Sequence, residues 1–326
     1  MKDKKVLIIK LGAIGDVVHT SIIPYAIKNK HPNWQIHYMT SPLIATLLKN
    51  CSYIDKVIAF DTRAEKPHSY MFSHVLNLMK ERYDYVFCLS HSLRLFILSF
   101  GSLPKKVVFR GYKGNSWVEN YFYSAADVIK DLELPERLVL EANPAVKEKV
   151  SNWMAQYPRP HVVINPGFLT PVGRQGRVWP LNYWKELADK ILETYGGTVF
   201  VNGGGYEYEY QKPLASERVI FVPKENSLED NSVVLSLADA VISGDSGPLH
   251  IASAFDVNTL AILGSTSPDD IRPYGAKGHY IGPDYECKYC WEKQCKKGAK
   301  PGEYPPCISS ISPDAVMEKI KEYNLI

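Results

Sequence analysis

The sequence predicts an α/β protein made of two doubly wound, parallel-sheet domains. Three observations lead to this fold class. Short apolar runs alternate with helical patterns, the alternation occurs twice along the 326 residues, and a proline-containing stretch separates the two series. Alternating strands and helices form parallel sheets with helices on both faces. Pro158 and Pro160 indicate a short, stiff linker, so the expected domains are residues 1–157 and 158–326.

The first series begins with an apolar strand at residue 4, followed by a glycine turn and a helical pattern. A second strand and helix follow, and later strands alternate with helices near residues 70–82 and 91–100. The predicted strands are, in order, KKVLIIK, WQIHYMTS, KVIAFD, YDYVFCLS and KKVVFRGY.

The second series repeats this rhythm in HVVINPG, GTVFVNGGG, ADAVISGDSG and NTLAILGST, with an amphipathic helix that ends at Gly196. The last helix covers about residues 312–326, with Ser312 as N-cap and Pro313 in the first turn. This helix can pack back on the first domain. Doubly wound folds bind ligands at the carboxyl ends of their strands, so we expect the site in a cleft between the domains.

Composition excludes several classes of protein. An apolar content of 45% and a charged content of 22% are typical of a soluble globular protein, and a net charge of +3 is too small to indicate nucleic-acid binding. Lys10 and Asp16 interrupt the first apolar stretch, which favours a strand over a signal peptide. No run approaches the ~20 apolar residues of a membrane span, so we expect a cytoplasmic protein.

The six cysteines are unevenly distributed. Cys51 and Cys88 stand alone in apolar surroundings, as buried thiols do. The other four have the spacing C-x2-C-x4-C-x11-C, and they are Cys287, Cys290, Cys295 and Cys307. In a cytosolic chain this pattern is compatible with a structural zinc site, with reduced thiols or with a disulfide. Nothing in the pattern indicates an open catalytic metal site.

The tetrapeptide Gly-Asp-Ser-Gly at residues 244–247 also surrounds the nucleophile of trypsin-like proteases. Here a short apolar strand precedes it, and Pro248 begins a helical pattern, so it is predicted to be a strand–turn–helix junction. A nucleophile elbow would need glycine where Pro248 stands. The junction instead predicts an anion site, because the amides of Ser246 and Gly247 lie at a helix N-terminus.

The first glycine turn lacks the fingerprint of a dinucleotide enzyme. It has only Gly12 and Gly15, and Ile14 fills the place where a pyrophosphate would approach. Asp16 at the start of the helix would repel a phosphate. It is either an N-cap or a carboxylate that accepts a proton from a sugar hydroxyl, with His19 one turn later on the same face.

Other loops carry charged residues that suit a nucleotide sugar and an anionic acceptor. Arg174 and Arg177 could neutralise a diphosphate, and Glu207 or Glu209 could hold a ribose hydroxyl. The first domain offers Arg94, Arg110 and Lys113 to an anionic acceptor. Each set is equally compatible with an ordinary charged surface or a flexible turn. The apolar stretch LFILSFG after Arg94 predicts a packed helix or an interfacial contact with lipid.

Several of these motifs together resemble glycosyltransferase family 9, the heptosyltransferases of lipopolysaccharide core assembly. The opening VLIIKLGAIGDVVHTSIIP resembles the family signature Lys-x-x-x-x-Gly-Asp-x-x-His-x-x-x-Pro, with one extra residue between His19 and Pro24. The later stretches CLSHSLRLFILSFGSLPKKVVFRGY, RVWPLNYWKELADKI and VISGDSGPLHIASAFDVNTLAILGSTSP are similar to family segments in the same order. The resemblance covers nearly the whole chain.

The resemblance implies a GT-B fold of two Rossmann-like domains and an inverting, metal-independent transfer that needs no cofactor. Asp16 would be the general base, with Gly15 and His19 beside the acceptor. Arg177 would contact the donor diphosphate, and Glu207 the ribose. The nucleotide-sugar site would be completed by Asp245, Ser246, Gly247 and His250.

The implied donor is ADP-heptose, and the implied acceptor is Kdo–lipid A or a heptosylated form of it. Such an acceptor would bring the enzyme to the cytoplasmic face of the inner membrane. The chain departs from the family at Leu11 and Ala13, where small hydroxyl residues are common, and at Arg177, where lysine is common. A guanidinium fork differs from an ammonium point charge, so another donor or acceptor is an open alternative.

Two further hypotheses belong to other classes. A nicotinamide-dependent oxidoreductase would share the doubly wound halves, but the chain lacks the triple-glycine fingerprint and an acidic residue after its second strand, where HYMTS stands. A non-catalytic sugar-binding relative would have lost its loop residues, whereas the loops of both halves are intact here.

Overall fold

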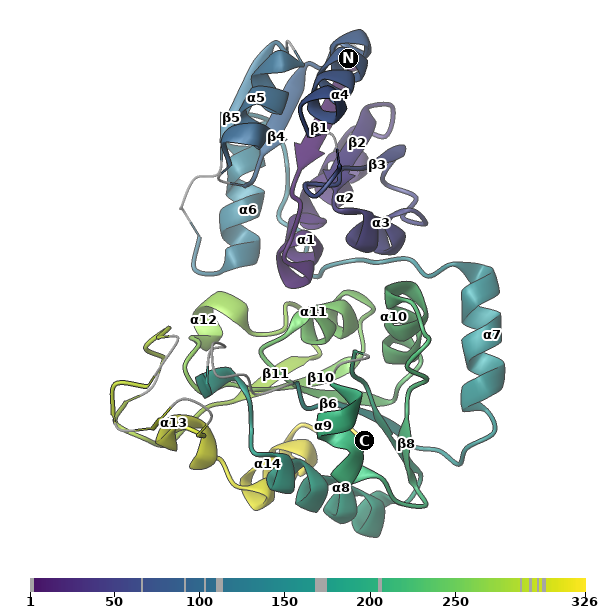
Figure 1. Ribbon diagram of the computed structural model, residues 1–326, viewed down its shortest axis with the longest axis vertical. Coiled ribbons are helices and arrows are strands. Elements are labelled where there is room, and N and C mark those ends of the chain that lie inside the picture. Colours follow the sequence, from purple (N-terminus) through teal and green to yellow (C-terminus); the bar gives the residue numbers. More distant parts are fainter. Residues whose placement is uncertain are drawn as a thin grey trace. The chain divides into compact units, whose positions relative to one another are not determined.

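The computed structural model describes residues 3–65, 67–90, 92–102, 104–109, 114–167, 175–204, 207–287, 289–292, 295–297, 299–300 and 303–326. The chain forms two compact units, Met1–Glu141 and Ala142–Ile326. Each unit contains its own parallel sheet with helices around it (Figure 1). The predicted α/β fold with two doubly wound domains is therefore confirmed.

The sheet of the first unit has the strand order β3-β2-β1-β4-β5, and its strands pair in parallel. Its strands are β1 (Lys5–Ile9), β2 (Gln35–Thr40), β3 (Lys56–Ala59), β4 (Tyr85–Cys88) and β5 (Lys106–Phe109). Its helices are α1 (Ile14–Thr20), α2 (Ile22–Lys30), α3 (Pro42–Leu48), α4 (Pro67–Glu81), α5 (Leu93–Gly101) and α6 (Trp117–Ala126).

The continuous apolar run of β1 has a direct structural reason. β1 is the central strand, and the side chains from Val6 to Ile9 are fully buried. Because helices cover both faces of a parallel sheet, a central strand needs apolar residues at successive positions instead of alternate ones. Ile9 pairs with Met39 of β2 and Cys88 of β4, so the loop after β1 begins beside the ends of both neighbours.

The sheet of the second unit has the order β11-β10-β9-β6-β7-β8 and is also parallel. Its strands are β6 (His161–Asn165), β7 (Thr198–Val201), β8 (Val219–Phe221), β9 (Ala240–Gly244), β10 (Asn258–Ile262) and β11 (Gly278–Ile281). Its helical segments are α7 (Pro144–Met154), η1 (Gln175–Arg177), α8 (Leu181–Tyr195), α9 (Tyr208–Gln211), η2 (Lys212–Leu214), α10 (Leu228–Ser236), α11 (Gly247–Ala254), α12 (Pro268–Ile271), α13 (Pro306–Ser309) and α14 (Pro313–Glu322).

The division between the units lies earlier in the chain than the expected boundary at residue 157. Helix α7 belongs to the second unit because it packs against α10 (Figure 1). Lys149 Nζ lies 2.8 Å from a carboxylate oxygen of Asp230, and the Trp153 ring packs on Phe200. The prolines at 158 and 160 therefore follow a helix that is already part of the second unit.

The last helix contributes to the core of the second unit, and its packing on the first domain stays a prediction. Helix α14 packs against α8, and its buried residues Val316, Met317 and Ile320 join the core of the second unit. Asn258 on β10 donates a hydrogen bond from Nδ2 to the Leu325 carbonyl at 3.0 Å. The N-cap prediction is confirmed, since Ser312 Oγ accepts a hydrogen bond from the Ala315 amide at 3.1 Å.

The strand orders locate the ligand-binding edges of the sheets. In the first unit the chain order reverses between β1 and β4, and in the second unit between β6 and β9. Crevices form outside the carboxyl ends of the strands at such switch points. The loops after β1, β6 and β9 are therefore the places where site residues are expected. Among the described residues, no helix is long and apolar enough to cross a membrane.

Candidate active site

Asp16 lies in the first turn of α1, directly after the loop that follows β1. A buried lysine and a buried tyrosine hold its carboxylate. Lys10 Nζ is 3.2 Å from Asp16 Oδ2 and donates a 3.0 Å hydrogen bond to the Tyr121 hydroxyl. That hydroxyl donates to Asp16 Oδ1 at 3.2 Å. The Lys10 side chain is 8% exposed and that of Asp16 37%, so the carboxylate can still reach solvent.

The alternative that Asp16 is the N-cap is wrong, because the N-cap of α1 is Ala13 and Asp16 is the third residue of the helix. The Ala13 amide donates to Asp16 Oδ2 at 3.3 Å, so the carboxylate contributes to capping from inside the helix. The contacts to Lys10 and Tyr121 are additional, and capping does not need them. Three groups thus fix the orientation of a partly exposed carboxylate at the carboxyl end of β1. Such a carboxylate can accept a proton from a bound hydroxyl group.

Lys10 and Tyr121 were not among the site residues predicted from the sequence. Lys10 could have been found from the sequence, because it occupies the lysine position of the family signature, five residues before Gly15. Tyr121 had none, because it lies on α6, 105 residues after the aspartate that it contacts. Only the packing of α6 against α1 brings the two together.

The other acceptor residues predicted from the sequence lie in different surroundings. Gly15 is on α1 beside Asp16, while His19 on the same helix is only 3% exposed. Arg94 is exposed at the start of α5, where Nη1 donates to the Thr62 carbonyl at 2.9 Å. Arg110 and Lys113, like Arg174 of the donor loop, lie outside the described residues. Contact of any of them with an acceptor or donor stays a prediction.

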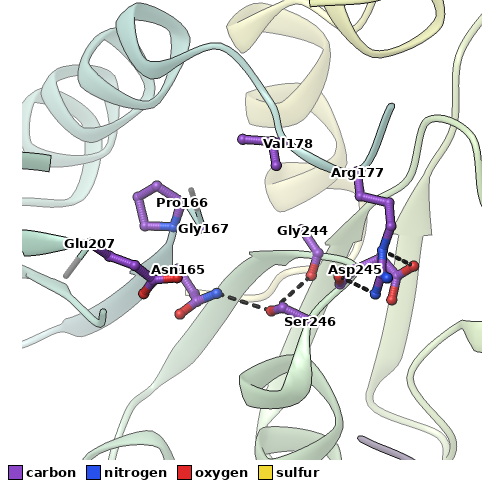
Figure 2. A pocket seen from close by; sticks show the side chains of 9 residues that line it. All are labelled: Asn165, Pro166, Gly167, Arg177, Val178, Glu207, Gly244, Asp245 and Ser246. Carbon is purple, nitrogen blue, oxygen red and sulfur yellow. Dashed lines mark hydrogen bonds and ion pairs between the residues drawn. The ribbon is translucent and has the colours of Figure 1, made fainter. Parts of the chain in front are cut away.

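The second unit holds a cavity of about 270 Å³ at its switch point (Figure 2). Three loops and the turn η1 form its walls. The loops follow β6, β7 and β9, whose carboxyl ends lie next to one another in the sheet. The lining residues are Asn165, Pro166, Gly167, Arg177, Val178, Glu207, Gly244, Asp245 and Ser246. Four predicted donor residues, Arg177, Glu207, Asp245 and Ser246, are thus brought to one cavity.

Arg177 is held against the loop after β9. Its Nε lies 2.7 Å from Asp245 Oδ2, and its Nη2 donates to the Asp245 carbonyl at 2.7 Å (Figure 2). The Asp245 side chain is 4% exposed and that of Arg177 33%. The planar guanidinium suits such a two-point contact, which a lysine ammonium cannot reproduce. Asp245 therefore positions the cation at the cavity wall.

A chain of side-chain hydrogen bonds fixes the Ser246 hydroxyl. Asn202 Nδ2 donates to Asn165 Oδ1 at 3.0 Å, and Asn165 Nδ2 donates to Ser246 Oγ at 3.0 Å. Ser246 Oγ in turn donates to the Gly244 carbonyl at 3.3 Å (Figure 2). It also lies 3.0 Å from Ser243 Oγ. Asn165 ends β6 and Asn202 follows the neighbouring strand β7, and sequence analysis missed both. Asn165 was visible in the sequence only as the last residue of HVVIN.

The structure separates the two glutamates considered for the ribose. Glu207 lines the cavity, and its Oε2 accepts a 2.7 Å hydrogen bond from the Gly204 amide. Burial raises the pKa of Glu207, an effect that the Gly204 amide opposes. Glu209 is exposed and forms an ion pair with Lys212 at 2.6 Å. Glu207 is therefore the better placed of the two for a ligand hydroxyl.

Gly247 and His250 belong to α11, the helix that begins at the cavity. Ser246 is the N-cap of this helix, which starts at Gly247 and carries Pro248 in its first turn. The positive end of the helix dipole thus lies directly after the cavity-lining Ser246. His250 is 4% exposed, so its side chain is part of the packed interior of the unit.

The four clustered cysteines line a second cavity, of about 200 Å³. All are free thiols, and Cys307 is buried. Burial, reinforced by the neighbouring thiols, raises the pKa of Cys307 to about 11. Among the described side chains, no three or more histidines, cysteines, aspartates or glutamates are grouped closely enough to hold a metal ion. The four thiols thus line one cavity, but no three of them lie close enough together to bind a single metal ion.

The chain matches the model of the family described as glycosyltransferase family 9 (heptosyltransferase) over residues 98–300. The chain belongs to glycosyltransferase family 9. The lipooligosaccharide heptosyltransferase 2 of Campylobacter jejuni is 23% identical over 332 aligned positions, which cover 95% of this chain and 96% of that protein. The resemblance predicted from the sequence motifs is therefore confirmed, and family 9 membership makes the protein a glycosyltransferase.

Two solved structures have the same fold over nearly their whole length. The family 9 glycosyl transferase from Veillonella parvula has a TM-score of 0.83 at 18% identity and covers 100% of this chain and 98% of that one. The E. coli ADP-heptose lipopolysaccharide heptosyltransferase II has a TM-score of 0.79 at 19% identity, with 98% of each chain covered. These family 9 structures confirm the GT-B fold, and the oxidoreductase hypothesis is set aside.

The contacts of Asp16 lead to a first prediction for this family 9 enzyme. Tyr121→Phe removes the hydroxyl that bonds to both Lys10 and Asp16, and leaves the ring in place. If Asp16 is the general base, as the sequence predicts, we expect sugar transfer to fall by about 10- to 100-fold, because a displaced base loses its alignment with the reacting atoms. The rate is measured by release of nucleoside diphosphate at saturating donor.

Tyr123→Phe, on the same helix α6, is the matched control and is expected to retain the parental rate. Nucleotide affinity should be unchanged in both variants, because Tyr121 and Tyr123 belong to the first unit. Equal rates for the two variants would show that the Tyr121 hydroxyl does not position Asp16.

Proposed function

We propose that this chain transfers a heptose from ADP-heptose to the lipopolysaccharide inner core, Kdo–lipid A or its heptosylated form, with inversion at the anomeric carbon. The observation that carries the proposal is the carboxylate of Asp16, which is partly exposed and held by Lys10, Tyr121 and the Ala13 amide. The donor assignment is supported by the name of the E. coli relative, an ADP-heptose heptosyltransferase.

In the proposed reaction, Asp16 accepts the proton of the acceptor hydroxyl as its oxygen attacks the anomeric carbon of the donor. The bond between that carbon and the diphosphate oxygen breaks, and its electron pair leaves with ADP. Attack from the face opposite the leaving group inverts the configuration. The diphosphate is already a good leaving group, so the barrier falls through charge stabilisation and alignment, and no general acid is required.

The cavity of the second unit has the groups that such a donor needs. Arg177 supplies positive charge at the cavity wall, and the N-terminal end of α11 adds a positive partial charge. Together they can stabilise the departing diphosphate without a metal ion or a cofactor. Ser246, fixed by Asn165, can bond to the donor, and Glu207 can hold a ribose hydroxyl.

The acceptor sites at Gly15, His19, Arg94, Arg110 and Lys113 belong to this proposal, as does the donor role of Gly247 and His250. A lipid-linked acceptor would bring the enzyme to the cytoplasmic face of the inner membrane. The partners are therefore a nucleotide sugar, an anionic glycolipid and a membrane surface, and no nucleic acid is among them.

The identity of the donor is tested with a panel of nucleotide sugars and a Kdo–lipid A preparation. We expect turnover with ADP-heptose, released ADP identified by mass, and a product whose anomeric configuration is opposite to that of the donor. Release of UDP or GDP alone would overturn the donor assignment, and retention of configuration would contradict direct displacement. Transfer of another sugar from its ADP derivative would show that the donor sugar is not heptose.

We also propose that the cysteine-lined cavity binds one structural zinc ion through Cys287, Cys290, Cys295 and Cys307. Four thiolates are a standard donor set for structural zinc. The segment that carries them is already anchored, because Gln175 Oε1 accepts a hydrogen bond from the Cys295 amide at 3.0 Å. Gln175 Nε2 donates to the carbonyls of Lys300 and Glu303, which fixes the backbone of this segment. In this proposal, movement of the cysteine side chains alone brings the four thiolates around the zinc ion.

Elemental analysis of protein purified under reducing conditions tests the zinc site. We expect about one zinc per chain, its loss in Cys290→Ser, and a lower melting temperature after chelation. Cys88→Ser removes a buried thiol outside the cluster and should keep the metal. Metal-free protein in which all four clustered thiols react with a thiol reagent at full activity would contradict the proposal.

A further inference from the structure

The first unit exposes large apolar side chains along one face of two helices. On α4 these are Phe72, Leu76 and Met79, with exposed fractions of 64%, 42% and 37%. On α5 they are Leu93, Phe96, Ile97 and Phe100, with fractions of 75%, 48%, 41% and 47%. Intervals of three and four residues place each set on one side of its helix. We call these seven side chains the α4–α5 apolar face.

The two helices lie against each other, so the two sets form one surface (Figure 1). The two helices approach each other closely at Gly101 of α5, where an added Cβ would lie 2.9 Å from Cγ1 of Val75 on α4. Leu78 of α4 and Leu98 of α5 are buried in the core of the unit. Both helices are thus apolar on the inner and the outer side. Packing in the core of the unit explains the apolar residues on the inner side of the helices but not those on the outer side.

This concentration of exposed apolar side chains is specific to the α4–α5 region. Ten large hydrophobic residues are exposed in the described part of the chain, and seven of them belong to this face. Single exposed hydrophobics are normal on any protein, whereas a contiguous group marks a surface that contacts a partner or a membrane. The ring pair Phe96–Phe100, with centroids 4.6 Å apart, adds bulk to the α5 side.

The charges around the face determine which partner fits. Residues 67–109 contain five basic and two acidic side chains, a net charge of +3 that equals the charge of the whole chain. Glu81 is paired with Lys5 and Lys56 at 2.8 Å, and Asp84 is paired with Lys105 at 2.5 Å. The basic side chains are exposed, and they are Lys80, Arg82, Arg94, Lys105 and Lys106.

We infer that the α4–α5 apolar face rests on an anionic lipid bilayer, with its apolar side chains in the interfacial region and the basic side chains on lipid headgroups. Helices with an apolar face that is surrounded by basic residues bind such surfaces in two ways. They bury apolar area in the interface, and their basic side chains are attracted to anionic lipids. A symmetric contact with a second copy would bring like charges together, which disfavours that occupant. Helices α4 and α5 have 15 and 9 residues, so they lie in the interface and do not span the membrane.

This inference rests on the proposed function in one respect. If the acceptor is lipid-linked, the enzyme must meet the bilayer surface where that acceptor lies, and the first unit carries the proposed base Asp16. The face would then hold the acceptor-side unit at the membrane. The contact itself can be measured without any sugar transfer.

Sedimentation of the full chain with lipid vesicles tests the inference. The vesicles contain phosphatidylcholine alone or equal parts of phosphatidylcholine and phosphatidylglycerol. We expect about tenfold or stronger binding to the anionic vesicles, weakened by salt. The triple variant Phe72→Ser, Leu93→Ser, Ile97→Ser should lower this binding by about tenfold or more. These side chains are exposed, and a melting curve checks that the variant is folded.

A matched control removes the three other large hydrophobic side chains that are exposed among the described residues, with Leu43→Ser, Tyr280→Ser and Tyr285→Ser. It should bind the anionic vesicles like the parent. The inference is overturned if the parent fails to bind anionic vesicles, or if the two triple variants bind equally. It is also overturned if size-exclusion chromatography shows a dimer that the first variant dissociates, since the face would then be a contact between copies.

A second readout separates this inference from the proposed function. Transfer to a lipid-free core oligosaccharide requires the active site but no membrane, and the Phe72/Leu93/Ile97 variant should retain it. A parent that binds anionic vesicles but transfers no heptose would contradict the proposed function alone. A parent that transfers heptose but never binds vesicles would contradict the membrane contact alone.

Discussion

The contact between the buried ammonium of Lys10 and the carboxylate of Asp16 is the constraint on which the proposed chemistry of the first unit depends. Lys10 follows the central strand β1 directly, so its position is set by the most buried part of the sheet. Tyr121 joins the pair from α6 and completes a triangle of polar contacts. A partly exposed carboxylate in the first turn of a helix could otherwise adopt several rotamers. Here its orientation is coupled to the packing of the whole unit, which would preorganise it for the proposed proton transfer.

The second unit fixes its site residues through hydrogen bonds between side chains at the ends of neighbouring strands. Its strand order places the ends of β7, β6 and β9 side by side, so Asn202, Asn165 and Ser246 form one hydrogen-bonded row. Arg177 comes from a separate turn and is held by Asp245 at the end of that row. The Arg177 guanidinium, which is paired with Asp245, and a fixed hydroxyl therefore line one cavity. The asparagine row orients the hydroxyl without adding a further charge to a cavity that already contains the carboxylates of Asp245 and Glu207.

Sequence reasoning predicted the elements whose signals are local. The apolar run of β1, the strand–turn–helix junction at Ser246 and the N-cap at Ser312 are each determined by a few adjacent residues, and all three are present. It missed Tyr121 and Asn202, because their roles arise from packing between segments far apart in the sequence. It also set the domain boundary too late, since Pro158 and Pro160 resemble a linker and the burial of Val150 and Met154 on α7 depends on tertiary contacts.

The central claim is that Asp16 is the proton acceptor in sugar transfer. The most direct measurement compares Asp16→Asn with the parent enzyme, using the rate of transfer at saturating donor and the affinity for ADP. Asparagine keeps the size of the side chain but cannot take the proton, and its Nδ2 cannot accept a hydrogen bond as a carboxylate oxygen does. The account predicts a fall in rate of about 100- to 10,000-fold with ADP affinity unchanged, and a melting curve checks that the variant is folded. A variant that transfers sugar within a few-fold of the parental rate would contradict it.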